Sequence, residues 1–350
     1  MLERFENADP VVCSVFDFFP PAFHKTILKA YFKILDFSPE VYKKMYDWGN
    51  ESVSVLKIRE YVSRYLAKRM YKFISSHKPA LIVCTHATTA GLVAYLKRKG
   101  KLNAPIATVI TDYVVHKLWV YPEFDYYFVA TEEMAHYLEE QGIDKTKIKI
   151  TGIPVTPSFC QKPDKNEICK DLEFDPARPI LLLMGGGAGL MPMDKIIENF
   201  DKNGIFAKLN FQTIAVTGKN TAMHEKISSL AQKIPQPIKP CGYVENVHEL
   251  MTVSDILISK AGGVTCAEAL ASGLPVLICH PLPGQEEANT RYLTNQGAAL
   301  LADSYSQLSD SLEQILVKEP EKFKELQSNA KNLGRPDAAF DIADCLGRYI

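Results

Sequence analysis

A glycine pair, Gly262-Gly263, follows the apolar run Asp255–Ser259 and precedes a helical pattern. Glycines at such a turn let backbone N–H groups come close to a phosphate, and the start of a helix adds partial positive charge. Glu268 lies about one turn into the predicted helix, on the same face as Thr265. A carboxylate in that position can accept both hydroxyl protons of a ribose. These spacings predict a site for a phosphate and a sugar diol.

Polar side chains follow the next predicted strand, Pro275–Cys279. Gln285, Glu286 and Asn289 supply the mixture of donors and acceptors that sugar hydroxyls need. Parallel strands end at a common edge of the sheet, where open α/β sheets bind their ligands. A glycine pair before a helix is often only a packing device, but this ordered series across successive β-α units is far more specific. It predicts one pocket for a phosphate, a ribose and a further sugar.

Short β-rich runs alternate with helical patterns along almost the whole chain. Continuous apolar strands separated by helices indicate parallel sheets that are covered on both faces. Two such series predict an α/β protein with two doubly wound domains. The predicted strands are Val11–Phe18, Ala80–Cys84, Pro105–Ile110, Tyr126–Ala130, Pro179–Met184, Phe211–Val216, Pro237–Cys241, Asp255–Ser259 and Pro275–Cys279. The predicted helices include Thr88–Lys99, Thr221–Lys233, Glu319–Leu333 and Asp337–Tyr349.

The length of 350 residues also fits two domains, because single cores stop growing at roughly 250–300 residues. Two prolines and a glycine interrupt the pattern at Thr151–Pro157, which predicts the join there; the alternative is an ordinary loop. The predicted boundaries are residues 1–152 for the first domain and 153–334 for the second. Residues 335–350 form a predicted C-terminal helix that could pack back on the first domain.

Composition and charge exclude several classes of protein. The net charge of −1 gives no reason to expect nucleic-acid binding, and no apolar run approaches the ~18–20 residues of a membrane span. The charged residues 1–6 do not resemble a signal peptide, so we expect a cytosolic protein. The eight cysteines contain no C-x-x-C pair, which favours reduced thiols over zinc sites or disulfides.

Residues 18–73 depart from the alternating pattern. They hold 13 of the 35 aromatic residues and eleven Lys/Arg against five Asp/Glu. Basic, amphipathic runs such as Ala22–Leu35 suit the surface of an anionic membrane. The alternative is a solvated helix face over an aromatic core.

The patterns K-A-G-G-x-T-x-x-E-A, G-x-P-V and P-x-P-G-Q-E-x-x-N between Lys260 and Asn289 resemble the donor half of the diacylglycerol glycosyltransferases. That family includes bacterial glucosyl enzymes and plant monogalactosyldiacylglycerol synthases, and it is related to the peptidoglycan glycosyltransferase MurG. The likeness covers nearly the whole chain, through Thr111-Asp112-Tyr113, Thr151–Pro154, Met184–Gly189 and Thr217–Asn220. It implies the GT-B fold, with two Rossmann-like domains that face a cleft.

The resemblance also implies a role for each matching residue in binding a UDP-sugar. Glu268 would hold the ribose, and Gln285 and Glu286 would bind the hexose. The run Gly185–Gly189 would open a helix, the alternative being a tight turn. The stretch Gly242-Tyr243-Val244 would lie near the uracil. The complete predicted donor set is Gly185, Gly186, Gly187, Gly242, Tyr243, Val244, Gly262, Gly263, Thr265, Glu268, Gln285, Glu286 and Asn289.

Enzymes of this kind invert the anomeric carbon by direct displacement, so a group must orient the acceptor hydroxyl and remove its proton. The candidates are Asp112, His86 and His116, each located after a predicted strand. For each histidine the alternative is a structural role. Backbone N–H groups can stabilise the departing diphosphate, and no D-x-D motif lies in a position to hold a metal, so we expect no metal and no cofactor.

The sequence departs from the family at its start. The family's first domain opens with a strand and a G-x-G-H loop, whose His is a candidate for positioning or deprotonating the acceptor. Residues 1–10 resemble the end of the helix that follows this loop, and the run Val11–Phe18 comes next. A misassigned start, a fragment and a lost element are the three alternatives. Without the first strand, an interior strand of the sheet would be exposed.

The function that follows is transfer of a hexose from UDP-glucose or UDP-galactose to diacylglycerol by a peripheral enzyme at the cytoplasmic face of the membrane. One alternative is a related enzyme, acting on a polyprenyl-linked acceptor or as a UDP-sugar epimerase. The other is a catalytically impaired UDP-sugar-binding protein, as the departure at the N-terminus permits.

Overall fold

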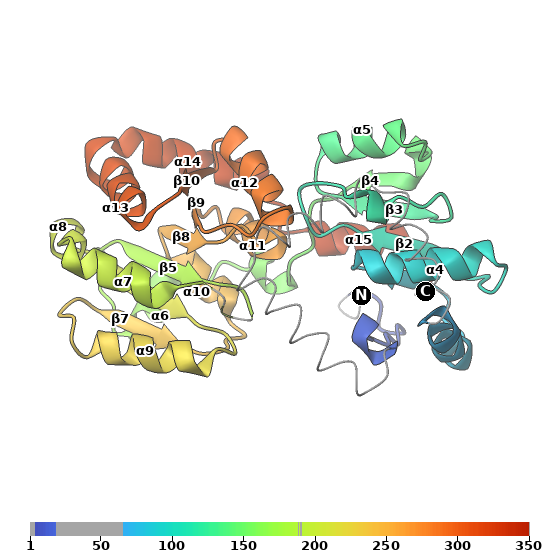
Figure 1. Cartoon of the computed structure of the whole chain (residues 1–350), viewed down its shortest axis with the longest axis horizontal. Helices are drawn as coiled ribbons and strands as arrows, with labels where there is room; N and C mark the ends of the chain where they lie inside the picture. The colour runs from blue at the N-terminus through green and yellow to red at the C-terminus, as the bar shows by residue number, and fades with distance from the viewer. Residues whose placement is uncertain (1–3, 19–65, 188, 190, 350) are drawn as a thin grey trace. The chain divides into compact units, whose positions relative to one another are not determined.

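Figure 1 shows a computed structural model of the chain, which describes residues 4–18, 66–187, 189 and 191–349. These residues form two compact units. The first unit comprises Met1–Pro154 together with Leu282–Gln285 and Ala338–Ile350, and the second comprises Val155–Pro281 together with Glu286–Asp337. Each unit contains a parallel sheet flanked by helices, which confirms the α/β class (Figure 1).

The sheet of the first unit has four parallel strands in the order β1-β2-β3-β4. Every residue of β2 and β3 is buried, as expected for strands covered on both faces. The strands are β1 (Ile82–Cys84), β2 (Ile106–Val109), β3 (Tyr126–Val129) and β4 (Ile148–Ile150). The helices are η1 (Val15–Phe18), α4 (Ala87–Arg98), η2 (Lys117–Trp119), α5 (Glu132–Glu140), η3 (Lys145–Lys147), α15 (Ala338–Leu346) and η6 (Gly347–Tyr349), with further helical turns across 66–77.

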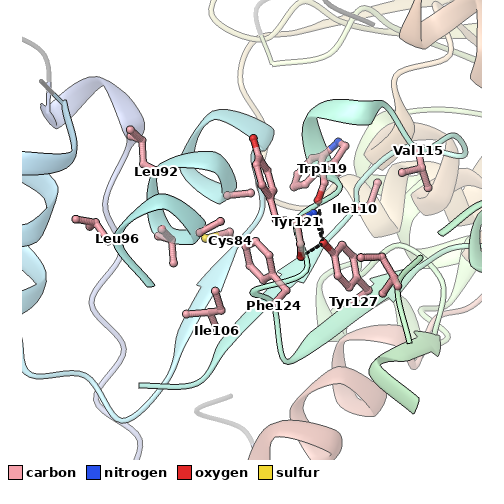
Figure 2. Close-up of a cluster of buried hydrophobic side chains, with 14 of the residues drawn as sticks. Cys84, Leu92, Leu96, Ile106, Ile110, Val115, Trp119, Tyr121, Phe124 and Tyr127 are labelled. Carbon is pink, nitrogen blue, oxygen red and sulfur yellow. Dashed lines mark hydrogen bonds between the residues drawn. The ribbon is translucent and has the colours of Figure 1, made fainter. Parts of the chain in front are cut away.

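The core between α4 and the sheet is organised around Tyr127, which is completely buried (Figure 2). Its hydroxyl accepts a hydrogen bond from the Tyr121 N–H at 2.7 Å and lies 2.7 and 3.1 Å from the carbonyl oxygens of Tyr121 and Trp119. The ring packs against Phe124, with ring centroids 5.6 Å apart. A buried hydroxyl is costly unless it is bonded, so these contacts fix the loop between β2 and β3.

The other face of this sheet is covered by α15, far away in the sequence. Ile342 and Leu346 of α15 pack in one apolar cluster with β2 and with Tyr126 and Phe128 of β3. The C-terminal helix therefore belongs to the core of the first unit, alongside β2 in Figure 1.

The predicted strand over Val11–Phe18 is wrong. Residues 11–14 have no regular structure and η1 covers Val15–Phe18. A strand needs a neighbour for its ladder of hydrogen bonds, but β1 pairs only with β2 among the described residues. Local bonds form instead: the Ser14 N–H donates to the Asp17 carboxylate at 2.7 Å, and Val12 remains 93% exposed.

The sheet of the second unit has six parallel strands in the order β10-β9-β8-β5-β6-β7. Its strands are β5 (Ile180–Met184), β6 (Gln212–Val216), β7 (Ile238–Cys241), β8 (Ile256–Ser259), β9 (Val276–Cys279) and β10 (Ala299–Ala302). Its helices are η4 (Pro157–Cys160), α6 (Lys165–Leu172), α7 (Met193–Lys202), α8 (Ile205–Leu209), α9 (Thr221–Ala231), α10 (Val247–Val253), α11 (Gly263–Ala271), α12 (Gln285–Asn295, whose first residue is grouped with the first unit), α13 (Tyr305–Glu313), η5 (Gln314–Lys318) and α14 (Pro320–Leu333).

The remaining predicted strands are confirmed within one or two residues, and two strands were missed. Both missed strands, β4 and β10, lie at the edge of a sheet. No helix in the described part of the chain is long and apolar enough to cross a bilayer. Most of the predicted basic, aromatic segment, residues 19–65, lies outside the described residues.

Candidate functional site

The loops at the carboxyl ends of the strands β5 to β9 of the second unit carry the predicted donor-binding residues. The first of them is the glycine run after β5. Gly186 and Gly189 have φ angles of +73° and +62°, and the Gly189 N–H donates to the Gly186 carbonyl at 2.9 Å. Helix α7 begins only at Met193, so the prediction that this run opens a helix is wrong. Left-handed φ angles cannot continue into a right-handed helix, and the run is a tight turn.

Close backbone contacts join this turn to the loop after β6. The Lys219 N–H donates to the Gly187 carbonyl at 3.1 Å, and the Asn220 amide donates to the Gly189 carbonyl at 3.0 Å. A Cβ atom on Gly218 would lie 2.6 Å from the Gly187 oxygen. Glycine is therefore required at this crossing by contact as well as by its positive φ.

The loop after β7 carries the predicted uracil-binding stretch. The backbone N–H of Thr217 donates to the Cys241 carbonyl at 2.8 Å, so this loop is bonded to the loop after β6. Tyr243 is 63% exposed, and the Lys219 ammonium lies 5.7 Å from the centre of its ring. An exposed aromatic face beside bonded backbone loops offers a surface on which a base can stack. Gly242 and Val244 flank this ring in the sequence.

Helix α11 begins at the glycine pair, with Gly262 as its N-cap and no side chain capping it. The first N–H groups of a helix have no intrahelical partner, and a Cβ built on Gly262 would meet nothing within 4 Å. Ala261, just before, has φ +67°, a left-handed conformation that is strained for a residue with a side chain. The helix start is thus free of a side-chain cap among the described residues and open beside Gly262, as the approach of an anion requires.

Glu268 lies on the fifth residue of α11 and is half-buried. Among the residues that the structure describes, its carboxyl has no hydrogen bond and no ion pair. Burial alone raises the pKa of this carboxyl from 4.5 to about 7. Thr265, one turn earlier, is also half-buried. An acid that is desolvated without a protein partner is the arrangement expected of a ligand-binding group.

Helix α12 brings the residues predicted to bind the hexose. Gln285 is its first residue, and Glu286 forms an ion pair with Lys260 at 3.3 Å. Asn289 is completely buried and donates its amide N–H to the Ala261 carbonyl at 3.1 Å. Asn289 therefore supports the strained turn before α11 as well as lying in the predicted set.

The three candidate catalytic residues lie in the first unit. His86 and His116 are N-caps of α4 and η2: their Nδ1 atoms accept from the N–H groups of Thr88 at 3.2 Å and Leu118 at 3.1 Å. Packing around the His86 ring lowers the pKa of the imidazole, and the negative charge of Asp112 acts in the opposite direction. The structure therefore brings Asp112 and His86 into the same electrostatic environment.

Comparison with known proteins identifies the family. Residues 1–155 match the family described as monogalactosyldiacylglycerol (MGDG) synthase, and residues 180–342 match the glycosyltransferase family 28 C-terminal domain. A processive diacylglycerol beta-glucosyltransferase from Bacillus cereus is 30% identical over 339 residues, which cover 97% of this chain and 85% of the relative. The chain belongs to the diacylglycerol glycosyltransferase family. A relative with the same name from Bacillus licheniformis is 33% identical over 266 residues, 76% of this chain and 68% of the relative.

Solved structures share the fold of this glycosyltransferase at low sequence identity. Acinetobacter baumannii MurG matches with a TM-score of 0.58 and 15% identity, covering 81% of this chain and 77% of that structure. A complex of Staphylococcus aureus MnaA with UDP matches with a TM-score of 0.63 and 15% identity, covering 83% and 81%. The fold is therefore GT-B, as the resemblance implied.

Two features of the site were not assigned from the sequence. Lys260 appeared in the K-A-G-G pattern without a role, and its carboxylate partner Glu286 is 26 residues away. The strained conformations of Ala261 and of His280, whose φ is +50°, also cannot be predicted from the residue types at these positions. The one available signal was a lysine directly at the end of an apolar strand, where a buried charge needs a partner.

Proposed function

We propose that this glycosyltransferase moves a hexose from a UDP-sugar to diacylglycerol at a membrane surface, with inversion at the anomeric carbon and without a metal. The observation that carries the donor half of this proposal is Glu268. This half-buried carboxyl, which has no partner among the described residues, lies one turn after the uncapped start of α11. That spacing suits the ribose and the diphosphate of a nucleoside diphosphate.

The donor would bind across successive loops. The uracil stacks near Tyr243, the diphosphate meets the N–H groups of Gly262, Gly263 and Thr265, and Glu268 accepts from the ribose hydroxyls. Bare N–H groups at a helix start stabilise negative charge as the diphosphate leaves, and they need no reorganisation at that moment. Gln285 and Glu286 bind the hexose. The turn Gly185–Gly187 supplies further backbone N–H groups.

On the acceptor side, Asp112 is our choice of general base. Both histidines use the Nδ1 lone pair as a helix cap, so each neutral ring carries its proton on Nε2 and has no lone pair left to accept another. His86 can therefore donate a hydrogen bond near Asp112 but cannot easily act as a base. The Asp112 carboxylate can accept the proton of the acceptor hydroxyl directly.

The substrates are proposed from the relatives. The Bacillus enzymes are named diacylglycerol beta-glucosyltransferases, which favours diacylglycerol as acceptor and glucose over galactose as the sugar. The basic, aromatic residues between 18 and 73 favour an anionic membrane surface at the cytoplasmic face.

The decisive experiment is product analysis with the purified chain, diacylglycerol in anionic vesicles, and either UDP-glucose or UDP-galactose. We expect a glucosyl lipid from UDP-glucose, and a polyprenyl-linked acceptor in parallel reactions should give no product. UDP binding without any lipid product would instead establish a catalytically impaired binding protein. The same vesicles should co-sediment the chain at low salt and less at high salt; no co-sedimentation at low salt would refute the membrane role.

A further inference from the structure

Lys260 directly follows the strand β8 and is one of the few buried charged residues in the described part of the chain. Its side chain is 9% exposed, and its ammonium lies 3.3 Å from Oε1 of Glu286, whose side chain is 15% exposed. Nothing in the folding of β8 requires a lysine here, because an apolar residue would fill the position without desolvating a charge. A buried pair that adds little to stability needs another reason to be present.

The position of the pair supplies that reason. Glu286 lies in the first turn of α12, and Asn289 one turn later donates to the carbonyl of Ala261 at 3.1 Å. Helix α12 is therefore bonded to two consecutive residues of the turn before α11, Lys260 through its side chain and Ala261 through its backbone. Ala261 is itself held in a strained left-handed conformation, which persists only where the surroundings impose it. These bonds tie α12 to the turn that offers its N–H groups to the diphosphate.

We propose that Lys260 is a positioning residue for hexose recognition. Its ammonium fixes the orientation of the Glu286 carboxylate and balances its charge, so that this carboxylate meets the hydroxyls of the hexose while the diphosphate occupies the adjacent turn. This inference rests on the proposed function, since it assumes that a UDP-hexose binds here. It differs from a direct role of Lys260 on the diphosphate, which the same charge could also fulfil.

The two roles predict different binding patterns. A residue that acts through Glu286 affects only the hexose, so Lys260→Met should leave the Kd of UDP within about twofold of the unchanged protein. The same substitution should raise the Kd of UDP-glucose about tenfold, and Glu286→Gln should do the same. Because both substitutions remove one interaction, the double variant should bind UDP-glucose no more weakly than either single variant.

Isothermal calorimetry on the full chain measures the Kd of UDP and of UDP-glucose for the unchanged protein and for each variant. The double variant also guards against misfolding, because it leaves no unpaired buried charge. Lys226→Met is the matched control, since Lys226 forms an ion pair with Asp194 at 2.8 Å but its side chain is 61% exposed. This substitution should change the Kd of neither UDP nor UDP-glucose.

A tenfold loss of UDP affinity in Lys260→Met would assign the lysine to the diphosphate and overturn the inference. Additive effects of the two substitutions in the double variant would overturn it as well. If UDP does not bind the unchanged protein at all, the proposed function fails first.

Discussion

Replacing Glu268 by Gln should stabilise the fold at alkaline pH. The folded protein raises the pKa of this carboxyl from 4.5 to about 7 through burial, so as pH rises the unfolded chain loses its proton first and the folded state loses stability. The loss begins near pH 4.5 and is complete above pH 7. A shift of this size corresponds to about 3 kcal/mol, and residual solvent access to a half-buried group lowers the expected effect to roughly 2 kcal/mol.

The assay is denaturant unfolding of the full chain at pH 5 and pH 8. Glu268→Gln removes the titrating group, so the variant should gain roughly 2 kcal/mol over the unchanged protein at pH 8 and only a small fraction of that at pH 5. Glu225→Gln is the control, because Glu225 is an exposed carboxylate of the same unit; it should change stability little at either pH. An equal effect of Glu268→Gln at both pH values, or destabilisation at pH 8, would refute the electrostatic reasoning.

The same substitution should weaken UDP binding while it stabilises the fold. A carboxylate that accepts two hydroxyl protons makes charge-assisted hydrogen bonds, whose loss costs about 1.5–3 kcal/mol, or roughly 10- to 100-fold in Kd. The ligand hydroxyls favour the ionised acid, so UDP affinity of the unchanged protein should rise from pH 6 to pH 8 more than that of the variant. Calorimetry at both pH values tests this, and equal affinities of the two proteins would remove Glu268 from the site.

The remaining substitutions test other parts of the molecule. Gly189→Ala places a Cβ 2.1 Å from a backbone oxygen and should lower the melting temperature strongly, whereas Gly142→Ala, at φ +85° with nothing within 4 Å, should cost only about 1 kcal/mol of backbone strain. Tyr127→Phe leaves a buried N–H without its acceptor and should cost about 1–3 kcal/mol in denaturant unfolding. Asp112→Asn should lower kcat roughly 100-fold or more, with an unchanged Kd for UDP; a smaller loss would exclude it as the base.

The fold was predictable wherever burial alone determines local structure. Runs such as Ile180–Met184 are buried along their whole length in the centre of a sheet. They are therefore apolar throughout, which makes them easy to identify as strands. The missed strand β4 is different: it is the triplet Ile-Lys-Ile, which no pattern distinguishes from a loop. Val11–Phe18 failed for the opposite reason, because an apolar run of suitable composition still needs a neighbouring strand with which to pair.

The relative placement of the predicted donor-binding residues followed from the sequence, but their contacts did not. Gly262, Gly263 and Glu268 lie within one strand-to-helix unit, so their relative placement follows from helix geometry. The bonds that cross the sheet edge, from α12 to the turn before α11, depend on a register that only the folded chain contains. The capping of His86 is similar, since a bond to a backbone N–H leaves no mark in the sequence.

Several locally unfavourable features meet at one strand end, and their coincidence says more than any of them alone. Lys260 carries a buried charge and Ala261 has a strained backbone. Within the part of the chain that the structure describes, no side chain caps the start of α11 and Glu268 is desolvated without a partner. Each of these features lowers stability, and a different residue would remove each cost. The replacements are an apolar residue for Lys260, a glycine for Ala261, a serine at the N-cap of α11 and a glutamine for Glu268. A chain selected for stability alone would not keep all four within nine residues. On binding, a ligand with a diphosphate and a sugar diol would offset two of them, the uncapped start of α11 and the desolvated Glu268. The strained turn presents the N–H groups that the diphosphate needs, and the Lys260–Glu286 pair orients the group proposed to bind the hexose.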